Sequence, residues 1–554
     1  MAVDHALFVS DRADAVKINS STLNAIQLAS PCASGCHGVV AMVPEESQMG
    51  ERRSQRRNVR GEGRGAETPR PLRYPYAPIE PLSPDEVELI HSSAMTVLED
   101  VGMRVMDPEA RSYLRAAGFR VDEASERVRF DGGRVMELVR QAPASTHVRG
   151  LDPAKRARIG GGHFALTAVG GPPFVSDIEK GRRYGTFADQ ENFLKIAAQS
   201  DLLQILGGTC VEAHDLPPET RYLDYYLACC RLSDKPWKPL TIGRHRARDA
   251  IEMAKIWYGE NEEELAADPV FFLNTNTNTP LVLDGEIAQG VIEYARIGQP
   301  ITVTPFALAG AMAPATVAGA LTIQTAETLA ACCLVQAVRP GAPYIYGSFI
   351  CSADMRTGSP SFGTPEFAFG AQASGQLARF YGLPWRSSNV NASNAVDAQA
   401  AYESMMSLWG AMTGQAGVFN HAAGWLEGGL VGSYEKFILD LEMLGMMAAW
   451  LDPPKINAAE IGLDAIREVG PGGHFFGTAH TMERYRNAFH APRVSDWSNF
   501  ETWSERGSRD ATVRASAISK EMIASYEPPK IDASRLEALE DYVARRKREI
   551  VTTA

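Results

Sequence analysis

Asparagine side chains recur just after short apolar runs of this chain. Asn274 and Asn276 follow one such run, Asn389 and Asn391 follow another, and His421 closes a third. If the runs are parallel strands, residues at their carboxyl ends converge at one rim of the fold. Asparagine also favours loops for reasons of turn geometry, so one position alone would be weak evidence. Their recurrence predicts a neutral, hydrogen-bonding site.

Aromatic residues are concentrated near the same positions. A cation over the face of an aromatic ring gains roughly 0.5–2 kcal/mol, most when water is excluded, so several rings can form a cage for a quaternary ammonium ion. Some of these residues must be ordinary core, and we single out Tyr346 and Phe349 as substrate contacts. The candidates are Phe306, Tyr346, Phe349, Phe362, Trp385, Trp409, Phe419, Trp425 and Tyr434.

The segment 354–366 combines an acid, a base, glycines and prolines directly after a predicted strand. Asp354 and Arg356 are candidate substrate-binding residues, because a guanidinium pairs well with a substrate carboxylate. An internal ion pair of Arg356 with Asp354 or Glu366 is equally compatible with the sequence. Glu366 opens the next predicted helix and is a candidate catalytic residue.

The sequence lacks the motifs of several common enzyme classes. The sequence contains no Walker A loop, no His-Glu-x-x-His and no Gly-x-Ser-x-Gly. The spacing of Cys32, Cys36 and His37 is a weak metal signal in a segment that we predict to be unstructured, and His474 and His480 fit a loop over the site or simple packing. The formal net charge of −12 argues against general nucleic-acid binding.

Short apolar runs alternate with helix-like stretches through most of the chain. Their spacing of about 30 to 43 residues is typical of repeated βαβ units. The pattern predicts an α/β fold, a (β/α)8 TIM barrel with an N-terminal α+β cap and a C-terminal helix; an open doubly wound sheet is the alternative. Segments 164–169 and 173–176 are predicted to pair as a hairpin. The predicted strands are 204–207, 239–242, 270–273, 301–304, 344–347, 385–388 and 417–419, and the eighth strand stays open.

Four segments follow from composition. Residues 1–75 are rich in Arg and Gly and form a predicted disordered tail. The tail either binds an acidic partner or RNA, or is simply disordered or the product of a start codon assigned upstream of Met42 or Met49. Residues 76–160 form the cap, 161–520 the barrel, and 521–554 a helical extension. No secretory signal is recognisable and cysteine usage fits a reducing compartment, so we predict a cytoplasmic protein without a membrane span.

From about Leu82 onward, the chain resembles the trimethylamine:corrinoid methyltransferase family. The resemblance is carried by LEDVGMRVMDPEA at 98–110, YGS at 346–348, DMRTG at 354–358, GTPE at 363–366, FYGLP at 380–384 and GPGGHF at 470–475. It implies a TIM barrel that presents a methylated amine to a Co(I) corrinoid carried by a separate protein.

The chain departs from this family at one position. Trimethylamine-demethylating members carry pyrrolysine a few residues after the FYGLP motif, whereas here the position falls on or beside Asn391. A quaternary ammonium releases a neutral amine when its methyl group is attacked, so such a substrate needs no special activation. The resemblance therefore implies a quaternary substrate, such as glycine betaine or a related betaine, with Asn391 as the second candidate catalytic residue.

The remaining expectations concern partners. The chain lacks an Asp-x-His-x-x-Gly corrinoid motif, so we expect no cofactor bound by the chain itself, a corrinoid protein as partner, and a homo-oligomer. A folate-type methyl acceptor is an alternative. Two other functions compete with this one. The first is a non-catalytic betaine-binding or regulatory barrel, and the second is a lyase or hydrolase with His421 as base and Glu366 as acid.

Overall fold

The first described helix begins as the sequence dictates. The computed structural model describes residues 72–153 and 155–553, so most of the predicted tail, including Cys32 and Cys36, lies outside the described residues. Helix α2 (Pro84–Thr96) is capped by Ser83, whose hydroxyl accepts the Glu86 N–H while Glu86 accepts the Ser83 N–H. This is the capping box that the sequence contains.

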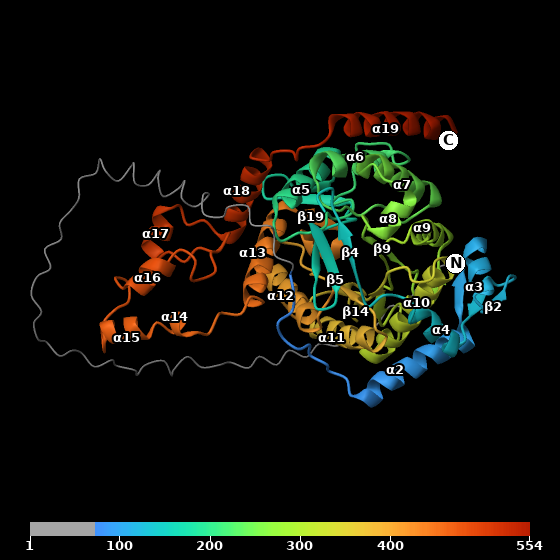
Figure 1. Ribbon diagram of the computed structural model, residues 1–554, viewed down its shortest axis with the longest axis horizontal. Coiled ribbons are helices and arrows are strands. Elements are labelled where there is room, and N and C mark those ends of the chain that lie inside the picture. The colour runs from blue at the N-terminus through green and yellow to red at the C-terminus, as the bar shows by residue number, and fades with distance from the viewer. Residues whose placement is uncertain (1–71, 154, 554) are drawn as a thin grey trace, which may run out of the picture. The chain divides into compact units, whose positions relative to one another are not determined.

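The N-terminal region contains a small α+β layer whose sheet includes one strand from later in the chain, β10. Its antiparallel strands join β10 in a four-stranded sheet of order β10-β1-β3-β2. Its helices pack against α10 of the main fold (Figure 1). The elements are π-helix η1 (Val97–Val101), β1 (Met103–Val105), α3 (Pro108–Ala116), β2 (Arg120–Asp122), β3 (Arg127–Arg129), α4 (Gly132–Val139) and β10 (Val282–Leu283).

A six-stranded parallel sheet forms the centre of the fold. Its order is β6-β17-β16-β13-β11-β9, and it is curled like part of a barrel (Figure 1). Its concave side holds a separate apolar cluster that includes Ile159 from the hairpin of β4 and β5. The strands are β4 (Ser145–Arg149), β5 (Arg156–Gly160), β6 (Ala165–Ala168), β9 (Leu273–Asn276), β11 (Ile301–Thr304), β13 (Tyr344–Gly347), β16 (Trp385–Ser388) and β17 (Val418–Ala423).

Three of the predicted strands are matched residue for residue, and 270–273 and 417–419 overlap β9 and β17 with shifted ends. The prediction for 239–242 is wrong because no strand forms there, 204–207 contributes only an isolated bridge at Ile205, and the predicted hairpin is also wrong. Strands 301–304, 344–347 and 385–388 are as expected. The hairpin of 164–169 with 173–176 does not form: β6 pairs in parallel with β17 instead, while β7 (Phe174–Asp177) pairs with β8 (Gly181–Tyr184) and β19 (Val431–Ser433).

Helices follow the strands and cover the sheet. They are α5 (Phe187–Gln199), α6 (Arg221–Leu232), α7 (Arg244–Tyr258), α8 (Glu262–Ala267), α9 (Gly285–Arg296), α10 (Val317–Val338), α11 (Pro365–Phe380), α12 (Ala398–Thr413) and α13 (Tyr434–Trp450). By length and composition α10 could cross a membrane, yet 72% of its most apolar window is buried inside the fold. It is therefore a core helix.

Short elements lie in the loops after the strands. They are β12 (Ala307–Ala309), β14 (Ile350–Ala353), β15 (Pro360–Ser361), β18 (Trp425–Leu426) and the 3₁₀ turn η2 (Glu427–Gly429). Strands β12, β14 and β15 form a small sheet of their own. These loops bring side chains from β11, β13 and β17 to the carboxyl edge of the parallel sheet.

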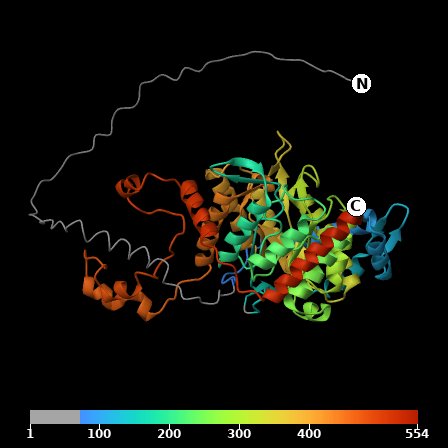
Figure 2. The same cartoon turned by 90° about the horizontal axis from the view of Figure 1, so that it is seen from above.

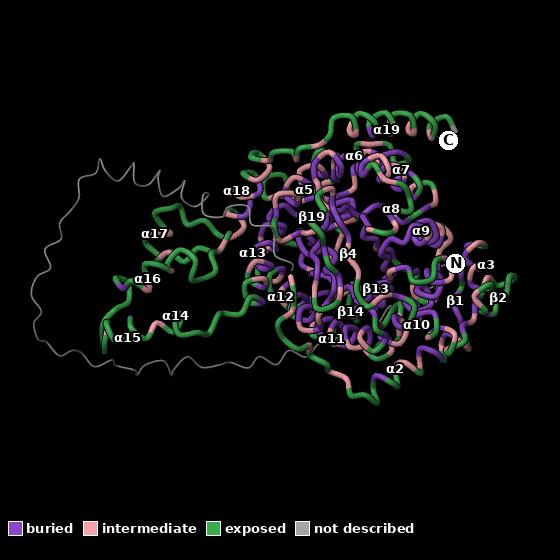
Figure 3. The backbone as a smooth tube through the Cα atoms, in the orientation of Figure 1, coloured by how far each residue is buried: buried purple, intermediate pink, exposed green. Residues whose placement is uncertain are grey.

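The C-terminal region combines exposed helices with two that dock. The short helices α14 (Ala458–Ile461), α15 (Leu463–Val469), α16 (Ala479–Arg484) and α17 (Phe500–Glu505) are mostly exposed, in contrast to the buried strands (Figure 3). Helix α18 (Ala511–Ala524) packs on α13 and α5. The predicted terminal helix is α19 (Ala533–Thr553), which lies along α6 and α7 (Figure 2). Its Arg546 contacts Asp249 at 2.7 Å.

Candidate active site

Four aromatic side chains converge at the carboxyl edge of the parallel sheet. Phe306 follows β11, Phe349 follows β13, Phe362 precedes α11, and Trp425 begins β18. The ring centroid of Phe349 lies 5.4 Å from that of Phe306, 5.7 Å from that of Phe362 and 6.0 Å from that of Trp425. We call these four residues the aromatic cluster. It provides ring faces where barrel enzymes carry their active sites.

His421 lies beside this cluster in a strained conformation. Its φ of 57° is in the left-handed region, within a register irregularity of β17. Its ring meets Trp425 edge to face at 4.4 Å, and its Nδ1 accepts the Gly170 N–H at 3.2 Å. Burial, followed by the charges of Lys238 and Arg386, lowers the pKa of His421 well below its ordinary value. The imidazole is therefore neutral, and such strain is typical of functional positions.

Two buried cations lie at the same edge. Arg386 is in β16, and its guanidinium carbon is 5.2 Å from the ring centroid of Phe349. Lys238 follows the strand-like segment at Trp237 and donates to the Asn420 side-chain oxygen at 3.0 Å. Sequence reasoning missed both residues. The available signal was a single cation in each of two otherwise apolar or neutral strand segments.

The predicted Asn389 and Asn391 are fully buried at the end of β16. Asn389 donates to the Ala422 carbonyl and to Asp440, both at 2.9 Å, and Asn391 donates to the Trp425 carbonyl at 2.7 Å. The side-chain oxygens of both asparagines have no protein partner among the described residues. These asparagines hold the loop that carries Trp425, and each keeps one acceptor free.

A buried ion pair on α13 contacts Asn389 and the backbone of the loop that carries Trp425. Lys436 pairs with Asp440 on α13 and also donates to Ser404 at 2.9 Å, while Asp440 accepts the Gly424 N–H at 2.8 Å. Burial lowers the pKa of Lys436 and raises that of Asp440, and their mutual attraction opposes both shifts. The pair is fully enclosed, and through Asp440 it contacts both the Asn389 side chain and the Gly424 backbone.

Asn274 and Asn276 lie within β9 itself, ahead of the loop 277–281. Asn274 accepts from the Thr304 hydroxyl at 3.3 Å, whereas Asn276 is exposed. The loop is fastened by Glu327 of α10, which accepts from Thr277, from Thr279 and from the Leu281 N–H. Burial is the largest influence on Glu327 and raises its pKa. Three donors satisfy this carboxyl group, which marks it as structural.

Other predicted cage residues face the covering helices. The Tyr346 hydroxyl bonds to Thr325 of α10 at 2.8 Å, so the side chain lies between sheet and helix. Trp385 donates to the carbonyls of Gly414 and Gln415. Phe419 packs on Phe164, Tyr434 stacks on Phe193, and Trp409 is partly exposed against Trp450.

The loop 354–366 does not place its charged groups in the aromatic cluster. Asp354 closes its own turn by accepting the Arg356 N–H at 3.2 Å and the Thr357 hydroxyl at 2.7 Å. The hydroxyl bond is the main reason that the pKa of Asp354 is lowered. Arg356 and Glu366 are exposed. What this loop contributes to the cluster is Phe362.

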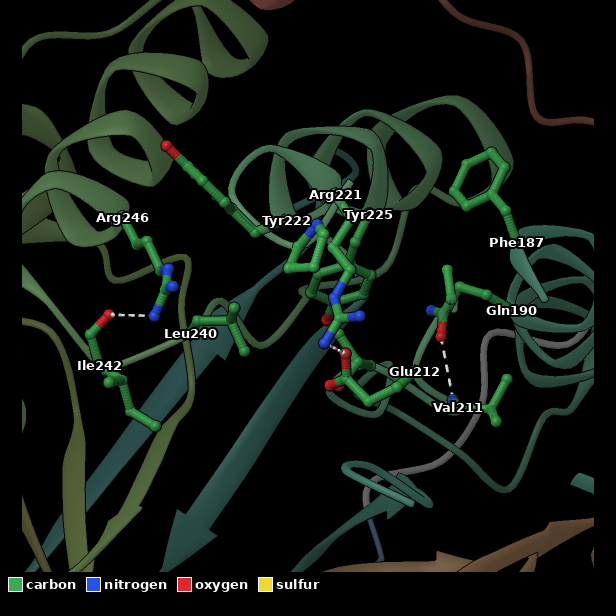
Figure 4. Close-up of a pocket in the computed structure, with 13 residues that line it drawn as sticks. Phe187, Gln190, Val211, Glu212, Arg221, Tyr222, Tyr225, Leu240, Ile242 and Arg246 are labelled. Carbon is green, nitrogen blue, oxygen red and sulfur yellow. Dashed lines mark hydrogen bonds and ion pairs between the residues drawn. The ribbon is translucent and has the colours of Figure 1, made fainter. Parts of the chain in front are cut away.

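A separate surface pocket of about 180 Å³ lies between α5, α6 and α7 (Figure 4). Two of its charged groups are paired with each other, since Arg221 contacts Glu212 at 2.9 Å, and Glu212 also accepts from Thr209, while Arg246 lies over the Tyr222 ring. The Tyr225 hydroxyl donates toward the carbonyls of Gly207 and Lys238 and so braces the segment behind Lys238. The aromatic cluster, with its unpaired groups, is the better site. Among the described residues, no group of three His, Cys, Asp or Glu side chains could hold a metal ion.

Comparisons with known proteins agree on one family. The family model described as trimethylamine methyltransferase (MTTB) matches residues 49–551. The glycine betaine methyltransferase of Desulfitobacterium hafniense (strain Y51) is 36% identical over 85% of this chain and 97% of its own length. The trimethylamine methyltransferase MttB of Desulfitobacterium hafniense (strain DCB-2) is 27% identical, covering 80% of this chain and 90% of its own.

Solved structures were compared as well. The hydroxylamine complex of MtmB aligns with a TM-score of 0.44 at 10% identity, over 81% of this chain and 93% of its own. The Methanosarcina barkeri monomethylamine methyltransferase (MtmB) gives a TM-score of 0.41 at 9% identity, with the same coverage.

Proposed function

Because this chain belongs to the trimethylamine methyltransferase family, we propose that it removes a methyl group from a small quaternary amine and passes it to an external nucleophile. The observation that carries the proposal is the aromatic cluster beside a neutral His421. Ring faces stabilise a quaternary ammonium through their quadrupoles, by roughly 0.5–2 kcal/mol each.

The chemistry requires positioning more than proton transfer. In the displacement a bond forms between the nucleophile and the methyl carbon, the C–N bond breaks, and the electron pair stays on nitrogen. The product amine leaves neutral, so no general acid is needed. This agrees with an aromatic cluster lined by amides and a neutral imidazole, whose main contribution is orientation.

The methyl acceptor comes from outside the chain in this proposal. Co(I) of a separate corrinoid protein is the acceptor that we propose, and a folate-type carrier is the alternative. Glycine betaine is the substrate named for one relative, and we propose it or a closely related betaine here. Asn391 donates to the Trp425 carbonyl and its side-chain oxygen has no protein partner among the described residues, which supports our proposal that this oxygen contacts the substrate.

The finer fold and setting are part of the same proposal. Closure of the curled sheet into a (β/α)8 barrel is supported by parallel bridges Thr167–Ile205 and Trp237–Phe271 and by the Leu206 N–H to Pro236 carbonyl bond of 2.9 Å. The aromatic cluster would then lie at the mouth of the barrel. A cytoplasmic homo-oligomer, and the four-segment division at 75, 160 and 520, remain predictions.

The test is turnover with a defined donor and acceptor. The purified chain is incubated with glycine betaine and chemically reduced cobalamin, and methylcobalamin is followed by its absorption while dimethylglycine is quantified by mass spectrometry. We expect the two products in equal amounts, and no reaction with trimethylamine. Reaction with trimethylamine alone would contradict the proposal, and binding of betaine without turnover would favour a non-catalytic binding protein.

A further inference from the structure

Lys238 and Arg386 are two buried cations that contact neutral partners. Their exposed fractions are 7% and 2%. Lys238 donates to the side-chain oxygen of Asn420, and Arg386 donates to the Ser348 carbonyl at 3.0 Å. Among the described residues, no carboxylate forms an ion pair with either, and the Nε of Arg386 has no partner. The two positive charges are therefore buried without a counter-ion.

This arrangement is costly for the protein alone. A buried charge is ordinarily paired, because removing it from water costs several kcal/mol. Burial lowers the pKa of Lys238 to about 7, with a further contribution from Arg386, and lowers the pKa of Arg386 to about 9. Among the described residues, Lys436 is paired with Asp440, and Lys235, which donates to the Ala197 and Ser200 carbonyls, has the carboxylates of Asp201 and Asp234 nearby. The difference indicates that Lys238 and Arg386 form a binding site for an anion that is not part of the protein.

The position of Lys238 and Arg386 indicates which kind of anion they bind. The guanidinium carbon of Arg386 is 5.2 Å from the ring centroid of Phe349, so Arg386 borders the aromatic cluster, and Lys238 interacts electrostatically with Arg386 and with His421. Strand geometry enforces this direction: Trp385 points toward the helices, and the next residue of β16 must point to the opposite face. An anionic group and an ammonium group bound here would be close neighbours.

We infer that Lys238 and Arg386 bind the carboxylate of a zwitterionic substrate whose ammonium group lies in the aromatic cluster. The inference rests on the proposed function and deepens it by fixing the substrate class. Arg386 can offer its Nε–H, and Lys238 its ammonium, as charge-assisted donors.

The surroundings of Lys238 couple this binding to protonation. The groups that face it are Arg386 from β16, Asn420 and His421 from β17, and the Cys210 thiol from the loop after Ile205. Above about pH 7 part of the free protein carries a neutral Lys238, and a bound carboxylate would restore its charge. Binding at pH 8 should therefore take up a proton.

The main experiment compares ligands that share a quaternary ammonium group, of which only glycine betaine carries a carboxylate. Affinities of glycine betaine, choline and tetramethylammonium are measured by calorimetry at pH 6.5 on the whole chain. We expect glycine betaine to bind at least about 100-fold more tightly than choline, since a hydrogen-bonded buried charge pair is worth two decades or more. Equal affinities would overturn the inference.

Variants locate the effect. Lys238→Met and Arg386→Met should each remove most of the preference for glycine betaine, Arg386→Lys should restore part of it, and the exposed Lys455→Met is the matched control that keeps it. Circular dichroism checks folding. If Arg386→Met does not fold, a second measurement tests the inference. Proton uptake on binding of glycine betaine at pH 8 is obtained from calorimetry in two buffers of different ionisation heat. We expect wild type to take up a proton and Lys238→Met not to. Retained preference, or no proton uptake, would contradict the inference.

Failure of this inference is distinguishable from failure of the proposed function. If choline and tetramethylammonium are demethylated as well as glycine betaine, methyl transfer stands and the carboxylate subsite is wrong. If no quaternary amine is bound or demethylated, the proposed function itself is wrong.

Discussion

The loop 354–366 and the end of β16 both carry charged residues that could bind a carboxylate, and these residues differ in burial. The loop 354–366 exposes Arg356 and Glu366 to water, and Asp354 closes its own turn. The end of β16 buries Arg386 beside the aromatic cluster, without an ion partner. A charge in water is already satisfied, whereas a buried unpaired charge has a large unmet interaction. Burial, more than residue type, identifies the binding group.

The strongest contrast between buried and exposed charges is structural. Lys436→Met leaves Asp440 buried without its partner and should cost roughly 3–5 kcal/mol of unfolding free energy. Arg467→Met breaks an ion pair with Asp464 whose side chains are 68% and 97% exposed, and should cost less than about 1 kcal/mol. Urea denaturation measures both. Equal losses would contradict the structural importance of the buried pair.

The second contrast concerns activity. Arg386→Met should lower kcat/KM for glycine betaine by about two to three orders of magnitude, because a desolvated charged contact with the substrate is lost. Arg356→Met, in the exposed loop, should lower it less than about tenfold. Initial rates of dimethylglycine formation provide the comparison. The reverse order would place the carboxylate on the loop, as the sequence first suggested.

The third contrast uses pH. Lys238 has a pKa of about 7 in the folded protein, lowered chiefly by burial from 10.5. The folded state therefore binds fewer protons than the unfolded state above about pH 7, and wild-type stability should rise as pH increases through this window. Between pH 9 and pH 6, wild type should lose roughly 2–3 kcal/mol of unfolding free energy through protonation of buried Lys238. Lys238→Met lacks this loss, so its unfolding free energy relative to that of wild type should rise by the same amount. A pH-independent difference would mean that Lys238 titrates normally.

The smallest contrast separates two tryptophans. Trp425 belongs to the aromatic cluster, whereas Trp409 is 39% exposed on α12. Trp425→Leu should raise KM for glycine betaine about 5- to 30-fold, the loss expected for one desolvated cation–π face. Trp409→Leu should change KM by less than about twofold. Steady-state kinetics of the two variants give both KM values. A larger increase in KM for Trp409→Leu than for Trp425→Leu would contradict the assignment of Trp425 to the binding site.

Much of the fold was predictable, because β11, β13 and β16 are compact runs with clear helical stretches between them. The error at residues 164–169 has a physical cause: β6 pairs with β17, some 250 residues later, and a parallel partner leaves no local turn signal. Turn chemistry can predict a hairpin, but it cannot reveal a distant parallel neighbour.

The site was predictable in part. His421, Phe349, Asn389 and Asn391 do lie at the carboxyl edge of the sheet. Tyr346 faces α10 instead, because strands buried on both faces lack the alternation that would show which side chains point inward. The same ambiguity concealed Arg386.

A crystal structure of the protein with glycine betaine tests the central claim most directly. The account predicts the ligand at the carboxyl edge of the sheet, with its methyl groups against Phe349 and Trp425 and its carboxylate within hydrogen-bonding distance of Lys238 and Arg386. Glycine betaine bound at Arg356 in the exposed loop, with the aromatic cluster unchanged, would contradict it.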